Sequence, residues 1–202
     1  MLDNEFRDIL DDNENIVWSD KPHLLVHILS GVPFLIIGLI WGAIDFFFLN
    51  AFNSFGGQTQ GFLLPFMLLH SAPFWLSIIN MLRLLVTYRN TYFAITNKRV
   101  LTRTGFMGID YTAKDFDIIS NVSVNVNPIE KMLGRGSIII NEYTSVQGTQ
   151  NVGRGNRLYG IANPYEIFKQ LKSMSLDIKT DIQFPNKFRP DTNPGYNTKY
   201  DK

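Results

Sequence analysis

Two long stretches without a charged side chain constrain this chain more than any other feature of its sequence. Residues 24–44 and 46–82 contain no Asp, Glu, Lys or Arg, and Asp45 is the only formal charge in nearly sixty residues. A water-soluble domain carries charge over most of its surface, whereas about 20 apolar helical residues cross the hydrocarbon core of a bilayer. The sequence therefore predicts two transmembrane helices.

The flanking residues set the boundaries of the predicted spans. We expect an N-terminal segment over residues 1–23, a first transmembrane helix over 24–49, an outer loop over 50–61 and a second helix over 62–86. The loop is polar, rich in glycine and uncharged, which is typical of a short exposed connection. The alternative, a hairpin buried in a soluble core, is disfavoured because a domain of this size rarely buries two adjacent uncharged stretches of this length.

Lys and Arg near the ends of the spans predict the orientation of the chain. The loop has neither, and Lys21 precedes the first span. Five basic residues follow the second span closely, namely Arg83, Arg89, Lys98, Arg99 and Arg103. Cytoplasmic flanks carry an excess of these residues, so we expect a multi-pass protein with both termini in the cytoplasm. The first apolar run is too long for the apolar region of a signal peptide, so no cleaved signal is expected.

Small residues in the spans predict close helix packing. Gly38 and Gly42 have the small-xxx-small spacing that lets two helix backbones approach each other. Packing of the first span on the second within one chain is favoured, and homodimerisation is the alternative. Pro73 lies in the middle of the second span and predicts a kink there.

The three histidines are the natural candidates for a metal site, but their placement disfavours one. His23 and His27 share one face of a helix, yet Asp20 is the only acid nearby to complete a site. The depths of His27 and His70 in the predicted hairpin differ by roughly 13 Å, too far for one ion. An ionisable group inside a membrane is costly, so for His70 we expect a neutral imidazole hydrogen-bonded across the hairpin. No metal and no cofactor is predicted.

From residue 87 onward, short β-rich runs replace the uncharged stretches. Tyr92–Thr96 and Arg99–Thr104 predict an antiparallel hairpin that turns at residues 97–98. Alternating or branched apolar residues predict further strands over residues 109–113, 116–126, 137–143, 146–152 and 157–161. This region, residues 87–176, is expected to form one water-facing domain, and the proline-containing residues 177–202 a flexible tail.

One helix is expected to close this domain. Asn163 suits the N-cap, Pro164 the first helical position and Glu166 the third position of a capping box. An apolar stripe for docking on the sheet follows, formed by Ile167, Phe168, Leu171 and Met174.

Charge is divided between the two ends of the chain. Residues 1–23 hold seven acidic and two basic side chains, a net charge of −5, whereas residues 88–176 hold six acidic and eleven basic ones, a net charge of +5. This basic excess is modest for a nucleic-acid binder, so no nucleic-acid partner is expected. It is sufficient for attraction to an anionic membrane surface.

Catalytic chemistry is not indicated in the water-facing domain. It contains no histidine, and the chain contains no cysteine, so its serines lack the imidazole base that a catalytic triad requires. Its acidic residues show no motif spacing. Gly134-Arg-Gly136 and Gly153-Arg-Gly155 could bind an anion, but turn geometry is the favoured explanation of both. We therefore expect no enzyme activity.

Three blocks of this domain resemble the bacterial pleckstrin-homology-like (PH-like) family of membrane proteins. The blocks are Tyr92–Gly105, Asp117–Val124 and Met132–Ile140, and Ile161–Tyr165 and Glu14–Pro22 also fit. The resemblance covers roughly residues 14–176. It implies an α+β membrane protein of the bacterial cytoplasmic (inner) membrane, in which a two-helix transmembrane hairpin precedes a seven-stranded, two-sheet antiparallel β-barrel capped by a C-terminal α-helix.

The same resemblance names a candidate binding site. In PH-like folds the first hairpin commonly contacts anionic headgroups, which implies such a role for Lys98, Arg99 and Arg103, with Lys131 and Arg135 as further candidates. The alternative is a solvated strand face with ordinary positive-inside charge. We predict a bilayer-anchored scaffold or adaptor whose partner is a second copy or another membrane or cytoplasmic protein. Sensing of anionic lipid headgroups is the alternative function.

Overall fold

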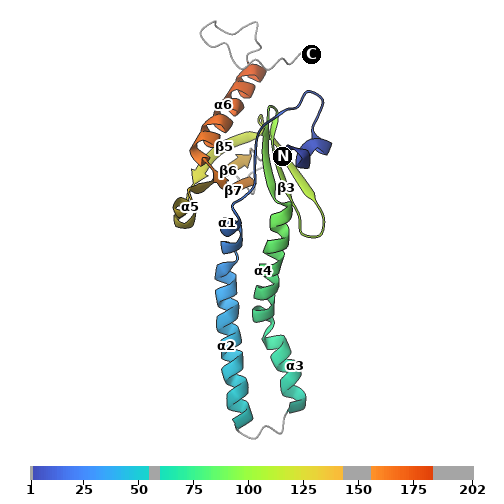
Figure 1. Ribbon diagram of the computed structural model, residues 1–202, viewed down its shortest axis with the longest axis vertical. Helices are drawn as coiled ribbons and strands as arrows, with labels where there is room; N and C mark the ends of the chain where they lie inside the picture. The colour runs from blue at the N-terminus through green and yellow to red at the C-terminus, as the bar shows by residue number, and fades with distance from the viewer. Residues whose placement is uncertain (1, 55–59, 143–155, 184–202) are drawn as a thin grey trace, which may run out of the picture. The chain divides into compact units, whose positions relative to one another are not determined.

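The computed structural model describes residues 2–54, 60–142 and 156–183, which belong to two compact units (Figure 1). The helical unit is Leu24–Asn90. The β unit combines Met1–His23 with Thr91–Lys202. The β unit is therefore discontinuous in sequence, because the whole helical unit is inserted between its first and second strands.

The described part of the helical unit consists of four helices. They are α1 (Leu24–Leu29), α2 (Val32–Ser54), α3 (Gln60–His70) and α4 (Ala72–Asn90). The chain turns back after α2, so that α2 packs antiparallel to α4 (Figure 1). Among the described residues, one helix is long and apolar enough to cross a membrane, over Val32–Phe52.

The second predicted span is two helices rather than one kinked helix. α3 ends at His70 and α4 begins at Ala72, with a turn at Ser71 between them. Pro73 therefore lies in the first turn of α4. Proline disfavours helical backbone in the residue before it and suits a helix start, which explains a break where the sequence predicted a kink.

Gly38 and Gly42 lie where α2 packs against α4. A Cβ atom on Gly38 would lie 2.1 Å from the Oγ atom of Ser77, and one on Gly42 would lie 2.7 Å from the ring of Phe74. A larger residue at either position would force the two helices apart. This face of α2 is already occupied by α4 of the same chain.

The strands of the β unit form two antiparallel sheets. The first has the order β1 (Ile16–Asp20), β2 (Tyr92–Thr96), β3 (Arg99–Thr104) and β4 (Asp110–Asp115). The second has the order β5 (Ile119–Asn125), β6 (Arg135–Glu142) and β7 (Asn156–Ala162). The described strands form these two separate sheets and no closed barrel, which corrects the barrel that the resemblance implied.

Two helices complete the β unit. α5 (Pro128–Met132) connects β5 to β6, and α6 (Pro164–Gln183) packs on both strands. The predicted apolar stripe of α6 is confirmed, because Ile167, Leu171 and Met174 are buried and Phe168 packs against the same core. The stripe continues at Ile178, which is also buried. For this reason α6 extends to Gln183, beyond the predicted start of a flexible tail at residue 177.

The main core lies between the two sheets and α6, and a second, smaller core lies on the other face of the first sheet. Neighbouring side chains of a strand point to opposite faces, so Phe93 and Ile95 of β2 enter the main core while Ala94 enters the smaller one. A 3-10 helix, η1 (Leu2–Ile9), covers this second face and fully buries Phe6.

The position of residues 1–23 corrects the predicted domain boundary. They were expected to be a segment outside the domain of residues 87–176, but β1 pairs with β2, with Asp20 opposite Phe93. Ile16 and Trp18 of β1 pack on the two cores of the unit. The domain thus needs both segments of the chain.

The predicted strands and the predicted helix cap of the β unit are confirmed only in part. The hairpin of Tyr92–Thr96 and Arg99–Thr104 is confirmed, whereas β5 begins at Ile119 rather than at residue 116. The predicted N-cap at Asn163 is wrong, because its φ is +47° and an N-cap residue has an extended backbone. A capping box is present instead at α5, where Asn127 and Glu130 form it. The predicted strand over residues 146–152 lies outside the described residues.

Burial of Phe6 predicts that the N-terminal segment contributes to stability. Phe6→Ala should lower the free energy of unfolding of the β unit by roughly 3–5 kcal/mol, the usual cost of removing a buried Phe ring. Urea unfolding can be followed through the fluorescence of Trp18 in full-length protein with Trp41 and Trp75 replaced by Phe. Phe106→Ala is the matched control, since Phe106 is 41% exposed. Equal effects of both substitutions would contradict the packing of η1.

Candidate functional site

The basic hairpin formed by β2 and β3 is covered by acidic side chains from the N-terminal segment. The guanidinium of Arg99 donates two hydrogen bonds to the carboxylate of Glu14, over 3.0 Å from Nε and 2.8 Å from Nη2. The same Nη2 atom lies 3.3 Å from Oδ2 of Asp11. Two-point pairing of this kind is among the stronger charged interactions in proteins.

Glu14 is buried and fully engaged at this position. Oε1 accepts a hydrogen bond of 2.6 Å from the hydroxyl of Thr96, and Oε2 accepts one of 2.9 Å from the backbone N–H of Asp11. Burial alone would raise the pKa of Glu14, but the hydrogen bonds from Arg99, Asp11 and Thr96 outweigh it and lower the pKa. The hydrogen bond to Glu14 also raises the pKa of Arg99. Both groups are therefore charged at neutral pH.

The other two cations of the hairpin also have partners in the N-terminal segment. Nη1 of Arg103 lies 2.6 Å from Oε2 of Glu5, and its guanidinium stacks over Tyr92 at 5.2 Å. Nζ of Lys98 donates a 3.1 Å hydrogen bond to the carbonyl of Asp12 and lies 4.0 Å from Asp11. All three candidates on the hairpin are thus brought together with acids.

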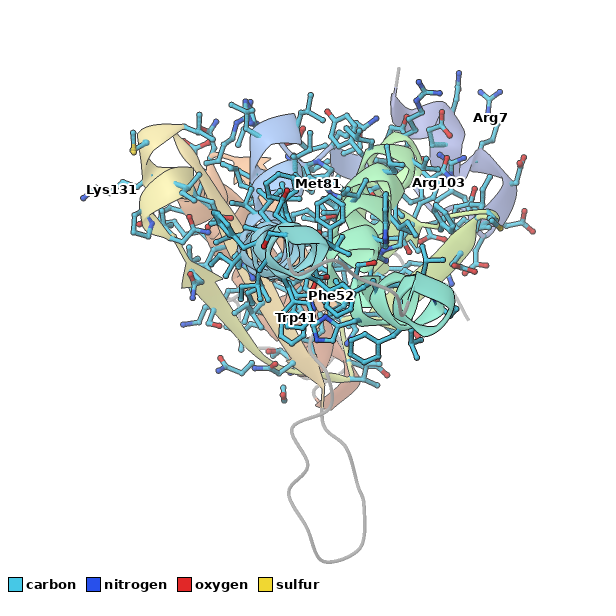
Figure 2. The ribbon with its side chains drawn as sticks, turned by 90° about the horizontal axis from the view of Figure 1, so that it is seen from below. Arg7, Trp41, Phe52, Met81, Arg103 and Lys131 are labelled. Atoms are coloured by element: carbon cyan, nitrogen blue, oxygen red, sulfur yellow. The ribbon has the colours of Figure 1, made fainter. Side chains whose placement is uncertain are left out.

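Lys131 and Arg135 are placed elsewhere. Arg135 lies 3.8 Å from Asp20 at the end of β1. Lys131 is exposed on α5, and Figure 2 shows it and Arg103 at opposite sides of the β unit. The five predicted cations therefore do not form one anion site.

Sequence reasoning missed the acidic partners because it treated residues 1–23 as a separate segment. The signal was nevertheless present, since the net charges of −5 and +5 are complementary and Glu14 lies within the block that resembles the family. Pairing these charges required knowing that residues 16–20 form a strand beside β2.

The turn between β3 and β4 presents apolar side chains to the surroundings. Phe106, Met107 and Ile109 are exposed, Met107 by 93%. Gly105 permits the turn, because its φ is +150° and a Cβ atom there would lie 2.0 Å from the carbonyl oxygen of Gly108. Strand pairing places this turn at the sheet end where β1 ends and β2 begins.

Glu130 is the most deeply buried acid among the described residues of the β unit, and its contacts give it a structural role. Its carboxylate accepts hydrogen bonds from the backbone N–H groups of Asn127 and Gly160, over 3.1 and 3.3 Å, and from the hydroxyl of Ser137. These bonds tie α5 to β6 and β7. Among the described residues, no group of three or more His, Asp or Glu side chains is placed to hold a metal ion.

Two histidines of the helical unit make hydrogen bonds between helices. Nε2 of His27 lies 2.9 Å from the carbonyl oxygen of Leu84 in α4. Nδ1 of His70 in α3 lies 2.7 Å from Oδ1 of Asp45 in α2. The predicted hydrogen bond of His70 across the hairpin is therefore present. Its partner, Asp45, is the one charged residue between the two uncharged stretches.

Comparison with known protein families identifies the family to which this chain belongs. A family model for the bacterial PH domain matches residues 34–175, more than half of the chain. The chain belongs to the bacterial PH domain family. Neither a curated protein nor a solved structure matches it. The matched part of this bacterial PH domain protein begins within α2, so β1 and the acids that cover the hairpin precede it.

Membership of the family makes the β unit a PH-type module, and PH-like domains are generally non-catalytic. The geometry adds that its basic hairpin carries acidic partners from the same chain: Glu5, Asp11 and Glu14. In this bacterial PH domain protein, an anion would therefore compete with these acids for Arg99 and Arg103.

The Glu14–Arg99 pair predicts a defined pH dependence of stability. Glu14→Gln should lower the free energy of unfolding of the β unit at pH 7 by roughly 1.5–3 kcal/mol, the range for hydrogen bonds to charged groups. The folded-state pKa of Glu14 is lowered, so its contribution is complete above the unfolded-state pKa and is lost as the pH falls through the folded value.

The difference between wild type and Glu14→Gln should therefore be largest near neutral pH and shrink below about pH 4. Trp18 fluorescence in urea, measured at several pH values, provides the readout. Glu166→Gln is the control, because Glu166 is exposed on α6. A difference that does not change with pH would contradict a charged Glu14 in the folded state.

Proposed function

We propose that this bacterial PH domain protein is a non-enzymatic, membrane-anchored scaffold or adaptor that binds a protein partner at the cytoplasmic face of the membrane. The observation that carries the proposal is the pairing of the hairpin cations with acids of the N-terminal segment. A PH-type module with these cations occupied, and with exposed apolar side chains at one end of its sheet, is suited to protein contact.

The helical unit supports the membrane anchor. Only 11% of the apolar window in Val32–Phe52 is buried, whereas the core helix of a soluble protein is largely buried. Asp20, just before α1, lies opposite Phe93, just after α4. Because the chain leaves the β unit and returns to it at this strand pair, an even number of crossings fits: α2 in one direction, α3 and α4 in the other. Positive flanks then favour cytoplasmic termini.

Energies disfavour headgroup sensing, the alternative function. A basic residue near an anionic membrane gains about 1 kcal/mol. A hydrogen bond to a charged partner contributes about 1.5–3 kcal/mol, and Arg99 donates two to Glu14. Exchanging Glu14 for a lipid phosphate would therefore cost more than the attraction of Arg99 to the membrane returns.

The exposed turn of Phe106, Met107 and Ile109 is the surface that we assign to the partner. Contiguous exposed apolar side chains mark interaction sites. The turn lies at the end of the sheet from which the chain continues into α1 and arrives from α4. Because the protein is proposed to be anchored in the membrane, a protein that is itself in or at the membrane is the partner that we expect.

Site-specific photo-crosslinking in native membranes tests this function. A photoreactive residue at Met107 of the full-length protein should give a discrete protein adduct, identified by mass spectrometry. The same residue at Met132, which is 87% exposed on α5, is the matched control and should give none. Monomer alone, or adducts only with lipid, would contradict a scaffold or adaptor role.

The alternative has its own readout. Amide hydrogen exchange of the β2–β3 hairpin should be the same in nanodiscs of neutral and of anionic lipid, because its cations are already paired. Protection that appears only with anionic lipid and disappears at high salt would instead favour headgroup sensing.

A further inference from the structure

Asp45 in α2 is a buried acid that neither the fold nor the proposed function explains. It is 5% exposed, and its Oδ1 atom lies 2.7 Å from Nδ1 of His70. Its second oxygen, Oδ2, is buried without a hydrogen-bond partner. An unsatisfied buried polar group is destabilising, and more so when charged, so such a group in a folded protein calls for a specific cause.

An apolar groove of the helical unit provides a cause. The groove has a volume of about 600 Å³, within the usual range of small-molecule sites. Asp45 lines it together with apolar residues of α2, α3 and α4, among them Leu39, Phe46, Met67, Phe74 and Trp75. Small-molecule sites are mostly apolar and have a few polar groups that fix the orientation of the ligand, and Asp45 can serve as such a group here.

The other polar groups at the groove are already engaged. The hydroxyl of Ser71 donates to the carbonyl of Leu68 over 3.2 Å and accepts from Nε1 of Trp75 over 3.0 Å. His70 is held between two rings, stacked on Phe66 at 5.4 Å and tilted on Trp41 at 5.2 Å. His70 thus satisfies Oδ1 from a fixed position, whereas Oδ2 has no hydrogen-bond partner.

We propose that this groove binds an alkyl ammonium amphiphile, with its head donating a hydrogen bond to Oδ2 of Asp45 and its tail lying along the apolar wall. The negative charge of the carboxylate determines which chemical class of head group binds best. An ammonium group supplies both the missing donor and a positive charge beside the carboxylate in an apolar setting. An alcohol supplies the donor alone, and an anionic head is repelled.

Quenching of Trp75 by brominated amphiphiles tests the proposal on full-length protein in a neutral detergent. Three probes of equal chain length carry a terminal bromine and differ in the head: ammonium, hydroxyl or carboxylate. The ammonium probe should quench in a saturable manner, and it should bind at least about tenfold more tightly than the other two. Replacing Trp75 by Phe should remove this signal, which assigns it to the groove. Equal quenching by the three probes would overturn the proposal.

Variants separate the carboxylate from the groove. Asp45→Asn keeps the shape but removes the charge, and should weaken the ammonium probe at least about tenfold. Asp8→Asn, the same change at an exposed position of η1, should leave binding unchanged. Ala43→Phe fills the groove, which Ala43 lines, and should abolish binding without altering Asp45. Should Asp45→Asn fail to fold, Ala43→Phe still decides, because unchanged quenching there would overturn the proposal.

Discussion

The pairing of β1 with β2 is the contact on which the rest of this structure depends. The two strands are neighbours in space although the whole helical unit separates them in sequence. Because β1 pairs there, η1 can cover the outer face of the first sheet with Phe6, and Glu14 can reach Arg99. The helical unit is thus an insertion between two neighbouring strands at one edge of a sheet. The buried contacts of residues 1–23 hold β1 in place beside β2.

Electrostatics in the β unit follow from that pairing. The basic residues of the hairpin would be a natural anion site if the N-terminal segment lay elsewhere, and the sequence alone suggested this. With the segment in place, hydrogen bonds from Arg99 to a buried carboxylate compete directly with attraction to lipid headgroups, and the buried pair is the stronger interaction. The apolar turn between β3 and β4 has no comparable internal partner for Met107. Contact with a protein is therefore the use that we propose for this module.

Some of the fold could be predicted from local pattern, and some could not. The hairpin of Tyr92–Thr96 and Arg99–Thr104 and the stripe of α6 follow from periodicity, which survives in a single sequence. β1 is five residues long and lies in an acidic segment, so only its long-range pairing with β2 identifies it as a strand. The break at Ser71 depends on how Pro73 starts a helix. The resemblance implied seven strands in two antiparallel sheets, and the described strands form them, but they do not form the barrel that it also implied. At the candidate site the cations were found from sequence, but their acidic partners required the tertiary contact.

Buried carboxylates show how this chain treats charge in its interior, and one of them is an exception. Glu14 accepts hydrogen bonds on both oxygens, from Arg99, Thr96 and the backbone of Asp11. Glu130 is bound by Asn127, Ser137 and Gly160. In both cases the fold supplies donors for the carboxylate, as expected where water is excluded. Asp45 lies in the most apolar part of the chain, where an unmet charge is most costly, yet His70 satisfies only one of its oxygens. Among the described residues, the fold supplies donors for the other buried acids and leaves this oxygen without one, in a residue that lines an apolar groove. The ligand that we propose for the groove brings the missing donor.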